Sequence, residues 1–281
     1  MKPFLAILFF LLYSGISSAV FCQSDYNNKP ARLGKHQMVD RSYMECVYEH
    51  VNYDPYYQST EIKDYILEIG KKASRYAFYE PYMRDSIIAA DHPNGLTNGE
   101  YHAISDRFSV KSLTEEIKDF ESNVLSHYET IFMDHYIYKE EMPVFEWTLT
   151  DSIEEVCGHP CKTATTTFRG RNWTAWYCEE IPVNNGPAKF SGLPGLILKV
   201  QDDKNEHIIE AMQVRKSDKE FGYKIRSFLI PTDRKTFNKM MNDYKMDVGT
   251  FLAGSQNLPK KLDGSSPFGH KRLFYNPIEK D

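Results

Sequence analysis

The sequence has no excess of basic residues and lacks the short motifs that mark common enzyme classes. Its 34 Lys and Arg residues are outnumbered by 39 Asp and Glu residues, which gives a formal net charge of −5. It contains no P-loop, no G-x-S-x-G nucleophile elbow and no H-E-x-x-H zinc motif. We therefore expect no nucleic-acid binding, and we assign no catalytic residue, metal ion or cofactor.

The chain also lacks an internal repeat and any charged linker that would separate domains. Its 281 residues, 41% of them hydrophobic, are enough to bury a substantial core. The 19 Tyr and 17 Phe residues favour sheets over helical bundles, because aromatic side chains suit a pleated surface. We predict a single β-rich domain over residues 23–281.

The N-terminus has the pattern of a secretory signal peptide. Lys2 precedes an apolar run over residues 4–13, which is shorter than the ~20 residues that a membrane-spanning helix needs. We predict a signal peptide over residues 1–22, cleaved after Ala19 or Cys22. The mature protein would then be exported, periplasmic or outer-membrane associated, without a transmembrane span. Lipidation of Cys22 is an alternative, although Phe21 is bulky for that processing.

Segments rich in aromatic and β-branched residues predict strands along most of the chain. Turn-forming residues separate them, and two successive hairpins are expected between residues 160 and 214. The predicted strands cover residues 42–53, 65–70, 136–150, 161–168, 173–181, 196–201, 207–214 and 223–230.

Between the two hairpins, Leu193-Pro194-Gly195-Leu196 predicts a type II turn. Proline fixes φ at the first central position, and glycine accepts a positive φ at the second.

Three segments have helical patterns. Over residues 112–131, Ser112 and Glu115 have the spacing of a capping box, and apolar residues follow at helical spacing. A second helix would begin after a cap at Thr232 and continue through residue 244, and a short one would cover residues 85–90. The predicted fold is mainly β, a curved antiparallel sheet or partly open barrel with two or three packed helices; α+β is the alternative.

Several motifs together resemble one known family. They are Cys161-Lys162-Thr163-Ala164-Thr165, Phe168-Arg169-Gly170-Arg171, Ala175-Trp176-Tyr177, Glu180-Ile181-Pro182, Gly186-Pro187, Gly192-Leu193-Pro194-Gly195-Leu196-Ile197-Leu198 and Asn276-Pro277-Ile278-Glu279. This string resembles the GLPGLI family of exported Bacteroidetes proteins. The resemblance implies a location in the cell envelope and no established activity.

Four cysteines remain besides Cys22, and an exported protein meets an oxidising compartment, where disulfides persist. If the first hairpin turns at Arg169-Gly170, Cys161 lies directly opposite Cys178, and a cross-strand bridge is geometrically possible. A turn at Gly170-Arg171 would move Cys178 to a diagonal position. We predict a Cys161–Cys178 disulfide. The other two cysteines are Cys46 and Cys157.

The segment Cys157-Gly158-His159-Pro160-Cys161 suggests metal or redox chemistry at first sight. It has one residue too many for a C-x-x-C redox motif. Alternate residues of one extended strand lie roughly 6.7 Å apart, too far to share one tetrahedral ion. A tight structural connection is therefore the better interpretation.

Charged and aromatic residues beside the first hairpin are the candidate binding residues. An arginine and a carboxylate are usual parts of a polar site, and an exposed tryptophan can stack on an apolar or sugar ligand. The charges could equally form ordinary surface ion pairs. In a regular strand Trp173 and Trp176 lie on opposite faces, so that one would be buried and the other exposed. The candidates are Arg169, Arg171, Trp173, Trp176 and Glu180, with Glu179 and Asp202 as further charged neighbours.

Three functions stay open at this point. The first is a binding or carrier protein for an apolar ligand, a peptide or a partner protein of the envelope. The second is an exported hydrolase or thiol-redox enzyme, and the third is a structural or assembly factor of the envelope that pairs through its edge strands. An apolar cavity would support the first, titratable groups converging in a cleft the second, and a flat exposed edge the third.

Overall fold

A computed structural model describes residues 25–108, 114–253 and 268–280. The predicted signal peptide, residues 1–22, lies outside the described residues. The chain divides into two compact units, one formed by Met1–Lys35 with Glu80–Lys111 and the other by His36–Tyr79 with Ser112–Asp281. Each unit is described by itself.

The larger unit consists of a β-sheet with two helices near the end of the chain. Its strands are β1 (His36–Asp54), β2 (Ser59–Gly70), β3 (Ala73–Phe78), β4 (Glu115–Asp119), β5 (Val124–Ile131), β6 (Asp134–Glu141), β7 (Thr148–Val156), β8 (His159–Phe168), β9 (Arg171–Cys178), β10 (Leu196–Asp202), β11 (His207–Lys216), β12 (Glu220–Lys224) and β13 (Ile230–Thr232), and its helices are α4 (Arg234–Met246) and α5 (Val248–Ala253).

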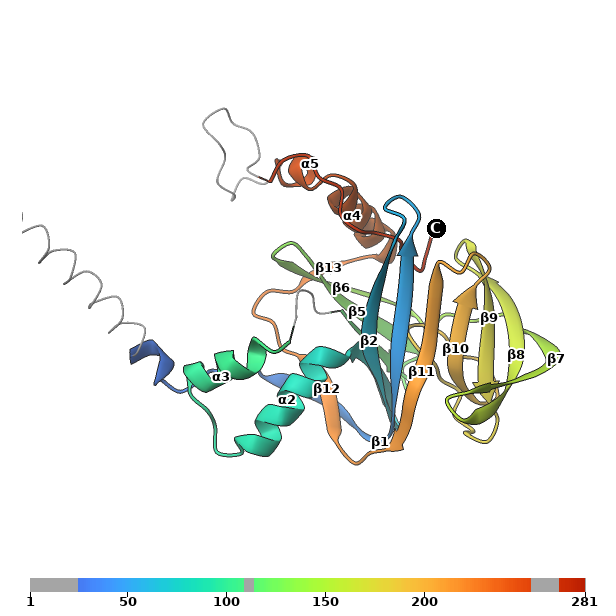
Figure 1. Cartoon of the computed structure of the whole chain (residues 1–281), viewed down its shortest axis with the longest axis horizontal. Helices are drawn as coiled ribbons and strands as arrows, with labels where there is room; N and C mark the ends of the chain where they lie inside the picture. Colours follow the sequence, from blue (N-terminus) through green and yellow to red (C-terminus); the bar gives the residue numbers. More distant parts are fainter. Residues whose placement is uncertain (1–24, 109–113, 254–267, 281) are drawn as a thin grey trace, which may run out of the picture. The chain divides into compact units, whose positions relative to one another are not determined.

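The strands follow the order β13-β6-β5-β4-β3-β2-β1-β11-β10-β9-β8-β7, and β12 pairs with β1 beside this path. All pairs are antiparallel except β13 with β6. The sheet is strongly curved, and it does not close, because β13 and β7 remain at its two ends (Figure 1). The predicted mainly β fold with a curved sheet and few helices is therefore confirmed. Among the described residues, no helix has both the length and the apolar character needed to cross a membrane.

The first predicted hairpin, β8–β9, turns at Arg169-Gly170, which is the alternative that places Cys161 opposite Cys178. Phe168 pairs with Arg171, which leaves Arg169 and Gly170 as a two-residue turn. Both turn residues have positive φ, 45° and 80°, as a type I′ turn requires. In this register Lys162 pairs with Tyr177, so Cys161 lies opposite Cys178.

The predicted type II turn at Pro194-Gly195 is wrong. Gly195 is not among the residues with positive φ; Gly192 has that conformation instead, with φ of 95°. A Cβ on Gly195 would lie 2.2 Å from the carbonyl oxygen of Cys178. Glycine is therefore needed here because the chain entering β10 passes against the end of β9.

The predicted helix over residues 112–131 is also wrong, since the described part forms β4 and β5. The Asp119 carboxylate accepts hydrogen bonds from the backbone N–H groups of Glu121 (3.0 Å) and Ser122 (3.1 Å). Asn123 adopts a φ of 58°. This Asx-type turn divides the apolar pattern, so residues at helical spacing lie on two strands.

The other helices agree better with the sequence. Helix α4 has Asp233, rather than Thr232, as its N-cap, and its carboxylate accepts a hydrogen bond from the Thr236 backbone N–H at 2.9 Å. Phe237 and Met241 form its buried face. The predicted strand 136–150 divides into β6 and β7, and 223–230 divides into β12 and β13.

The core of the larger unit lies beneath β8 to β11, where large side chains are almost fully buried. Buried Lys118 connects the sheet to the loop before β10, since its Nζ donates to Asn185 Oδ1 (2.9 Å), to Phe190 O (2.8 Å) and to Gly186 O. Burial lowers the pKa of Lys118 to about 7. This anchor fixes the loop that carries Lys189. The largest core residues include Trp173, Tyr48, Tyr177, Phe190, Leu196 and Ile197.

The smaller unit contains helices α2 (Tyr79–Asp91) and α3 (Asn98–Ser105). Helix α2 contains the predicted short helix over residues 85–90. Helix α3 begins with a capping box between Thr97 and Glu100, a pattern visible in the sequence and not used in the prediction. Ile88, Leu96 and Ile104 form the apolar cluster of this unit.

Gly195→Ala is predicted to lower the free energy of unfolding by about 1–3 kcal/mol, because the added methyl group overlaps the Cys178 carbonyl. Urea denaturation of the purified protein measures this change. Ser191→Ala, in the same loop, is the control and should change stability by less than about 0.5 kcal/mol. Equal stability of Gly195→Ala and the wild type would contradict the close approach.

Candidate functional site

A cavity of about 230 Å³ lies in the larger unit, among strands of the sheet, helix α4 and the C-terminal segment Phe274–Glu279. A second cavity of about 140 Å³ shares part of its lining, including Tyr65 and Glu129. The lining residues of the first cavity that matter for its chemistry are His50, Asn52, Tyr65, Tyr76, Glu116, His127, Glu129, Tyr138, Lys189, Phe237, Lys245 and Glu279.

Aromatic rings form much of the cavity wall. Tyr65 stacks on Tyr76 with ring centroids 4.8 Å apart and an interplanar angle of 2°. Tyr138 stacks on the His127 ring at 4.7 Å, and Phe237 of α4 lies 5.5 Å from Tyr138. Such flat walls can hold an apolar ring or chain.

His127 is held between two carboxylates of the same wall. Its Nδ1 lies 3.0 Å from Glu116 Oε1, and its Nε2 lies 2.9 Å from Glu129 Oε2. Burial alone would lower the pKa of His127, but the hydrogen bonds to Glu116 and Glu129 outweigh it and raise the pKa to about 9. Both ring nitrogens therefore carry protons near neutral pH and donate to the carboxylates.

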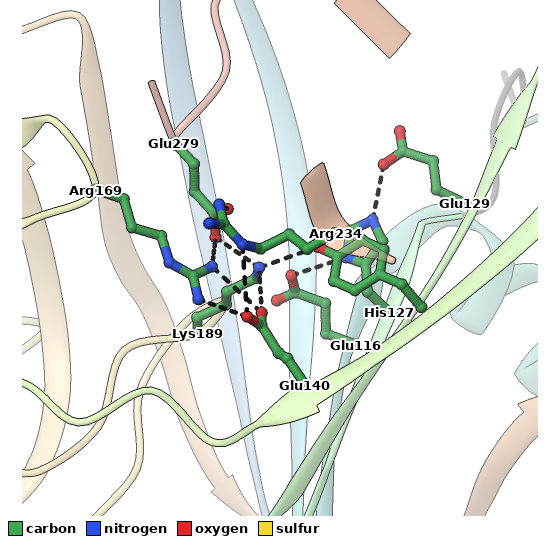
Figure 2. Close-up of polar contacts among 9 residues, drawn as sticks. Glu116, His127, Glu129, Glu140, Arg169, Lys189, Arg234 and Glu279 are labelled. Atoms are coloured by element: carbon green, nitrogen blue, oxygen red, sulfur yellow. Dashed lines mark hydrogen bonds and ion pairs between the residues drawn. The ribbon is translucent and has the colours of Figure 1, made fainter. Parts of the chain in front are cut away.

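A second charged group lies at the end of the cavity that includes Glu279 and Lys189, as Figure 2 shows. We call it the Glu279 network; it contains three cations and two carboxylates from five separate segments. Lys189 lies 2.7 Å from Glu140 and 2.5 Å from Glu279, and Arg234 at the start of α4 lies 2.9 Å from Glu279. Its members are Glu140, Arg169, Lys189, Arg234 and Glu279.

Glu279 is the centre of this network. Burial would raise its pKa, but the charges of Lys189 and Arg169 and their hydrogen bonds lower the pKa to about 2. The carboxylate therefore stays ionised and anchors the C-terminal segment to the sheet. Backbone groups on both sides of Glu279 also hold this part of the chain. The Tyr275 N–H donates to Asp54 Oδ2 at 2.9 Å, and the Lys280 N–H donates to Arg169 O at 2.9 Å.

Three cavity-lining side chains have buried polar atoms without a hydrogen-bond partner among the described residues. They are Asn52 Oδ1, the Tyr76 hydroxyl and Glu116 Oε2, and the Tyr76 and Glu116 side chains are only 6% and 7% exposed. Leaving such a group unsatisfied costs about 1–3 kcal/mol, and more for a charged group. A ligand that forms a hydrogen bond with one of these atoms would therefore recover binding free energy.

His50 and His207 form a neutral pair beside the cavity. His50 Nε2 and His207 Nδ1 lie 3.0 Å apart, so one ring donates and the other accepts. Burial lowers the pKa of His50 to about 3 and that of His207 to about 2. The His50–His207 pair therefore adds no charge to the cavity near neutral pH.

The structure distributes the five predicted binding residues over separate places. Arg169 belongs to the Glu279 network. Arg171 is buried in another ion network with Asp202 (2.6 Å) and Glu206 (2.7 Å).

Neither tryptophan forms an exposed platform. Trp173 is 1% exposed and Trp176 is 9% exposed, so the prediction of one exposed ring is wrong. Trp173 packs against Phe190 in the core, and Lys199 lies over the Trp176 ring at 5.1 Å. Glu180 is exposed beyond the end of β9 and is not among the cavity-lining residues.

The cysteines occur as thiols in the structure. Cys46, Cys157, Cys161 and Cys178 are all free, so the predicted Cys161–Cys178 disulfide is not formed there. The register that would allow it is present, and the two thiols are in hydrogen-bond contact.

The main cavity residues are not predicted from the sequence, for an identifiable reason. His127 and Glu129 are two apart, so they point to one face only if residues 124–131 form a strand, whereas the sequence pattern predicts a helix there. Glu116 lies opposite His127 on the neighbouring strand, which makes the group visible only when the register is known. Glu279 was noted only as part of the terminal Asn-Pro-Ile-Glu motif.

A pH titration followed by NMR tests the environment of His127. We expect its imidazole to titrate near pH 9 in the wild type, and at a lower pH in Glu116→Gln, because one of its two carboxylate partners is removed. Since the pKa is raised in the folded state, this group stabilises the fold fully below about pH 6.5, and its contribution is lost as the pH rises through about 9. A wild-type value at or below 6.5 would contradict the geometry.

Arg171→Met is predicted to destabilise the protein by about 3–5 kcal/mol, because it leaves the carboxylates of Asp202 and Glu206 without their buried cation. The change in unfolding free energy is measured with urea. Lys162→Met, which breaks the exposed pair with Glu179, is the matched control and should cost at most about 1 kcal/mol. Similar losses in the two variants would contradict a structural role of Arg171.

Comparison with known proteins gives a family of unknown activity and a shared fold. The family described as "Protein of unknown function (Porph_ging)" matches residues 121–199. No curated protein matches the sequence. Two solved structures of PNGF-II are similar to this chain. The structure in space group P21 has 12% sequence identity and a TM-score of 0.51, and the match covers 79% of this chain and 38% of PNGF-II. The structure in space group C2 has 13% identity and a TM-score of 0.48, and the match covers 73% of this chain and 33% of PNGF-II. The chain thus spans less than half the length of PNGF-II, and the likeness concerns the fold alone.

Proposed function

We propose that this chain is an exported envelope protein that binds a small ligand in the cavity between its sheet, helix α4 and C-terminal segment. The observation that carries the proposal is the presence, in one cavity, of stacked aromatic walls and of buried polar atoms without partners. Stable proteins satisfy nearly all such atoms, so the presence of these atoms in the cavity wall supports a missing ligand.

The size of the cavity limits the ligand. Its volume of about 230 Å³ is below the roughly 300–1,000 Å³ of pockets for drug-sized molecules. We therefore propose a compact molecule, or one side chain of a peptide, rather than a fully enclosed long acyl chain. The ring of Tyr65, stacked on Tyr76, would contact the apolar part of the ligand.

The polar end of the ligand follows from Glu116. Its Oε1 accepts from His127, and its Oε2 has no partner in the part of the chain that the structure describes. A carboxylate oxygen accepts hydrogen bonds only, so the matching ligand group is a donor such as an ammonium, amide N–H or hydroxyl. The Tyr76 hydroxyl can donate or accept beside it.

Binding is favoured over acid–base catalysis by the state of His127. A general base must have a nitrogen free to accept a proton, whereas both nitrogens of His127 are directed at carboxylates and the pKa is raised to about 9. Converging titratable groups, the feature that would support a hydrolase, are thus present, but both nitrogens of His127 are occupied by carboxylates.

Assembly through the sheet edge has weaker support. Strand β7 ends the sheet and exposes Leu149 and Ile153. Its exposed Asp151, Glu154 and Glu155 place like charges along the same edge, a feature that discourages strand pairing.

Export and family membership are part of the proposal. The first 22 residues have the n-region, apolar run and small residues of a signal peptide. The segment matched by the family of unknown function includes Gly192–Leu198, the motif that resembles the GLPGLI family. Both support a location in the envelope.

Native mass spectrometry of protein isolated from its envelope fraction tests the proposal. We expect a bound small molecule on the wild type. Glu116→Gln should reduce its occupancy by about tenfold or more, because a charge-assisted hydrogen bond of about 1.5–3 kcal/mol is weakened. Tyr76→Phe should reduce it less.

Tyr128→Phe is the matched control, since Tyr128 stacks on Tyr223 and does not line the cavity. It should retain full occupancy. A wild type without any bound molecule, or equal occupancy in wild type and Glu116→Gln, would overturn the proposal.

A further inference from the structure

Four potential metal ligands lie at one end of the β8–β9 hairpin, outside the cavity. The register places Cys161 opposite Cys178, the last residue of β9. His159 is the first residue of β8, and Glu180 lies in the turn that follows β9. The start of β8 and the turn after β9 therefore bring the four residues to the same end of the hairpin.

The ligand atoms are close together. One nitrogen of His159, the Cys178 sulfur and one carboxylate oxygen of Glu180 all lie within 4.8 Å of one another. The Cys161 thiol is in hydrogen-bond contact with Cys178 and lies 3.5 Å from the His159 carbonyl oxygen. Three ligand atoms, one each of nitrogen, sulfur and oxygen, are thus grouped, and the Cys161 thiol lies next to the Cys178 thiol.

We propose that the reduced protein binds a divalent transition-metal ion of the zinc type through His159, Cys178 and Glu180, with Cys161 as the fourth ligand. Thiolate, imidazole and carboxylate are the usual zinc ligands, and four of them match its tetrahedral preference. The two thiolates argue against Mg²⁺ and Ca²⁺, which take oxygen ligands.

Closing the site requires only small movements. Bonds of ~2.0–2.3 Å in a tetrahedron place the ligand atoms about 3.5 Å apart, so the 4.8 Å group must contract by about 1 Å. Both sulfurs are in the core and fully buried, whereas His159 is half-buried and Glu180 is exposed beyond the end of β9. The side chains of His159 and Glu180 are therefore the ones with space to move toward the sulfurs.

Residues of a single strand cannot form this site. Cys157, His159 and Cys161 alternate along the chain and are too widely spaced. Cys178 at the end of β9 and Glu180 in the following turn complete the set, and Cys157 belongs instead to the β7–β8 turn, with φ of 52°.

Disulfide formation and metal binding compete in this geometry, because a Cys161–Cys178 bridge would remove both thiolates from the ligand set. The redox state of Cys161 and Cys178 therefore determines whether the hairpin contains a disulfide or can bind a metal ion.

Cobalt and zinc titrations of the reduced full chain test the site. Co²⁺ should bind once per chain and give the thiolate charge-transfer band and the visible d–d bands of a tetrahedral site, and Zn²⁺ should displace it. Cys178→Ser should abolish the charge-transfer band or reduce it strongly. Glu180→Gln, at an exposed position that folding does not require, should weaken Zn²⁺ binding by about tenfold or more.

Cys157→Ser is the matched control, because it removes a nearby thiol outside the ligand set, and it should leave binding unchanged. Protein with a mapped Cys161–Cys178 disulfide should not bind. No binding by the reduced wild type, or Zn²⁺ affinity unaffected by both Cys178→Ser and Glu180→Gln, would overturn the proposal.

Discussion

The ion pairs of the buried Glu279 carboxylate are the interactions on which the cavity depends. A charge at this depth is tolerated only with cations beside it, and Lys189, Arg169 and Arg234 supply them. These cations come from the loop before β10, the β8–β9 turn and the start of α4, so one carboxylate connects four segments far apart in the sequence. The C-terminal segment and α4 also meet on the sheet through an apolar cluster, in which Tyr275 packs against Tyr138, Phe237 and Met241.

The Glu279 network also explains why the cavity has two different ends. At one end every charged group has partners of opposite charge. At the other, Glu116 shares only one of its oxygens with His127, and the Tyr76 hydroxyl has no hydrogen-bond partner among the described residues. We therefore propose that Glu116 and its neighbours bind the ligand, and that the Glu279 network stabilises the fold around the cavity.

The sequence predicted features that depend on neighbouring residues and missed those that depend on distant ones. The β8–β9 hairpin followed from its strand pattern and its Arg169-Gly170 turn. The same local reasoning failed at residues 112–131, where Asp119 and Asn123 form a turn inside a pattern of helical period. Arg169 is a candidate from the sequence, but its ion-pair partners lie 29 and 110 residues away, and no local pattern identifies them.

The central claim is that Glu279 holds the C-terminal segment over the cavity, and hydrogen–deuterium exchange tests it most directly. In the wild type, the amides of Tyr275 and Lys280 should exchange slowly, because they donate to Asp54 and Arg169. In Glu279→Ala they should exchange much faster, whereas the amides of β9 and β10 should keep their wild-type protection. Fast exchange of the segment in the wild type, or equal exchange in the two proteins, would contradict the account.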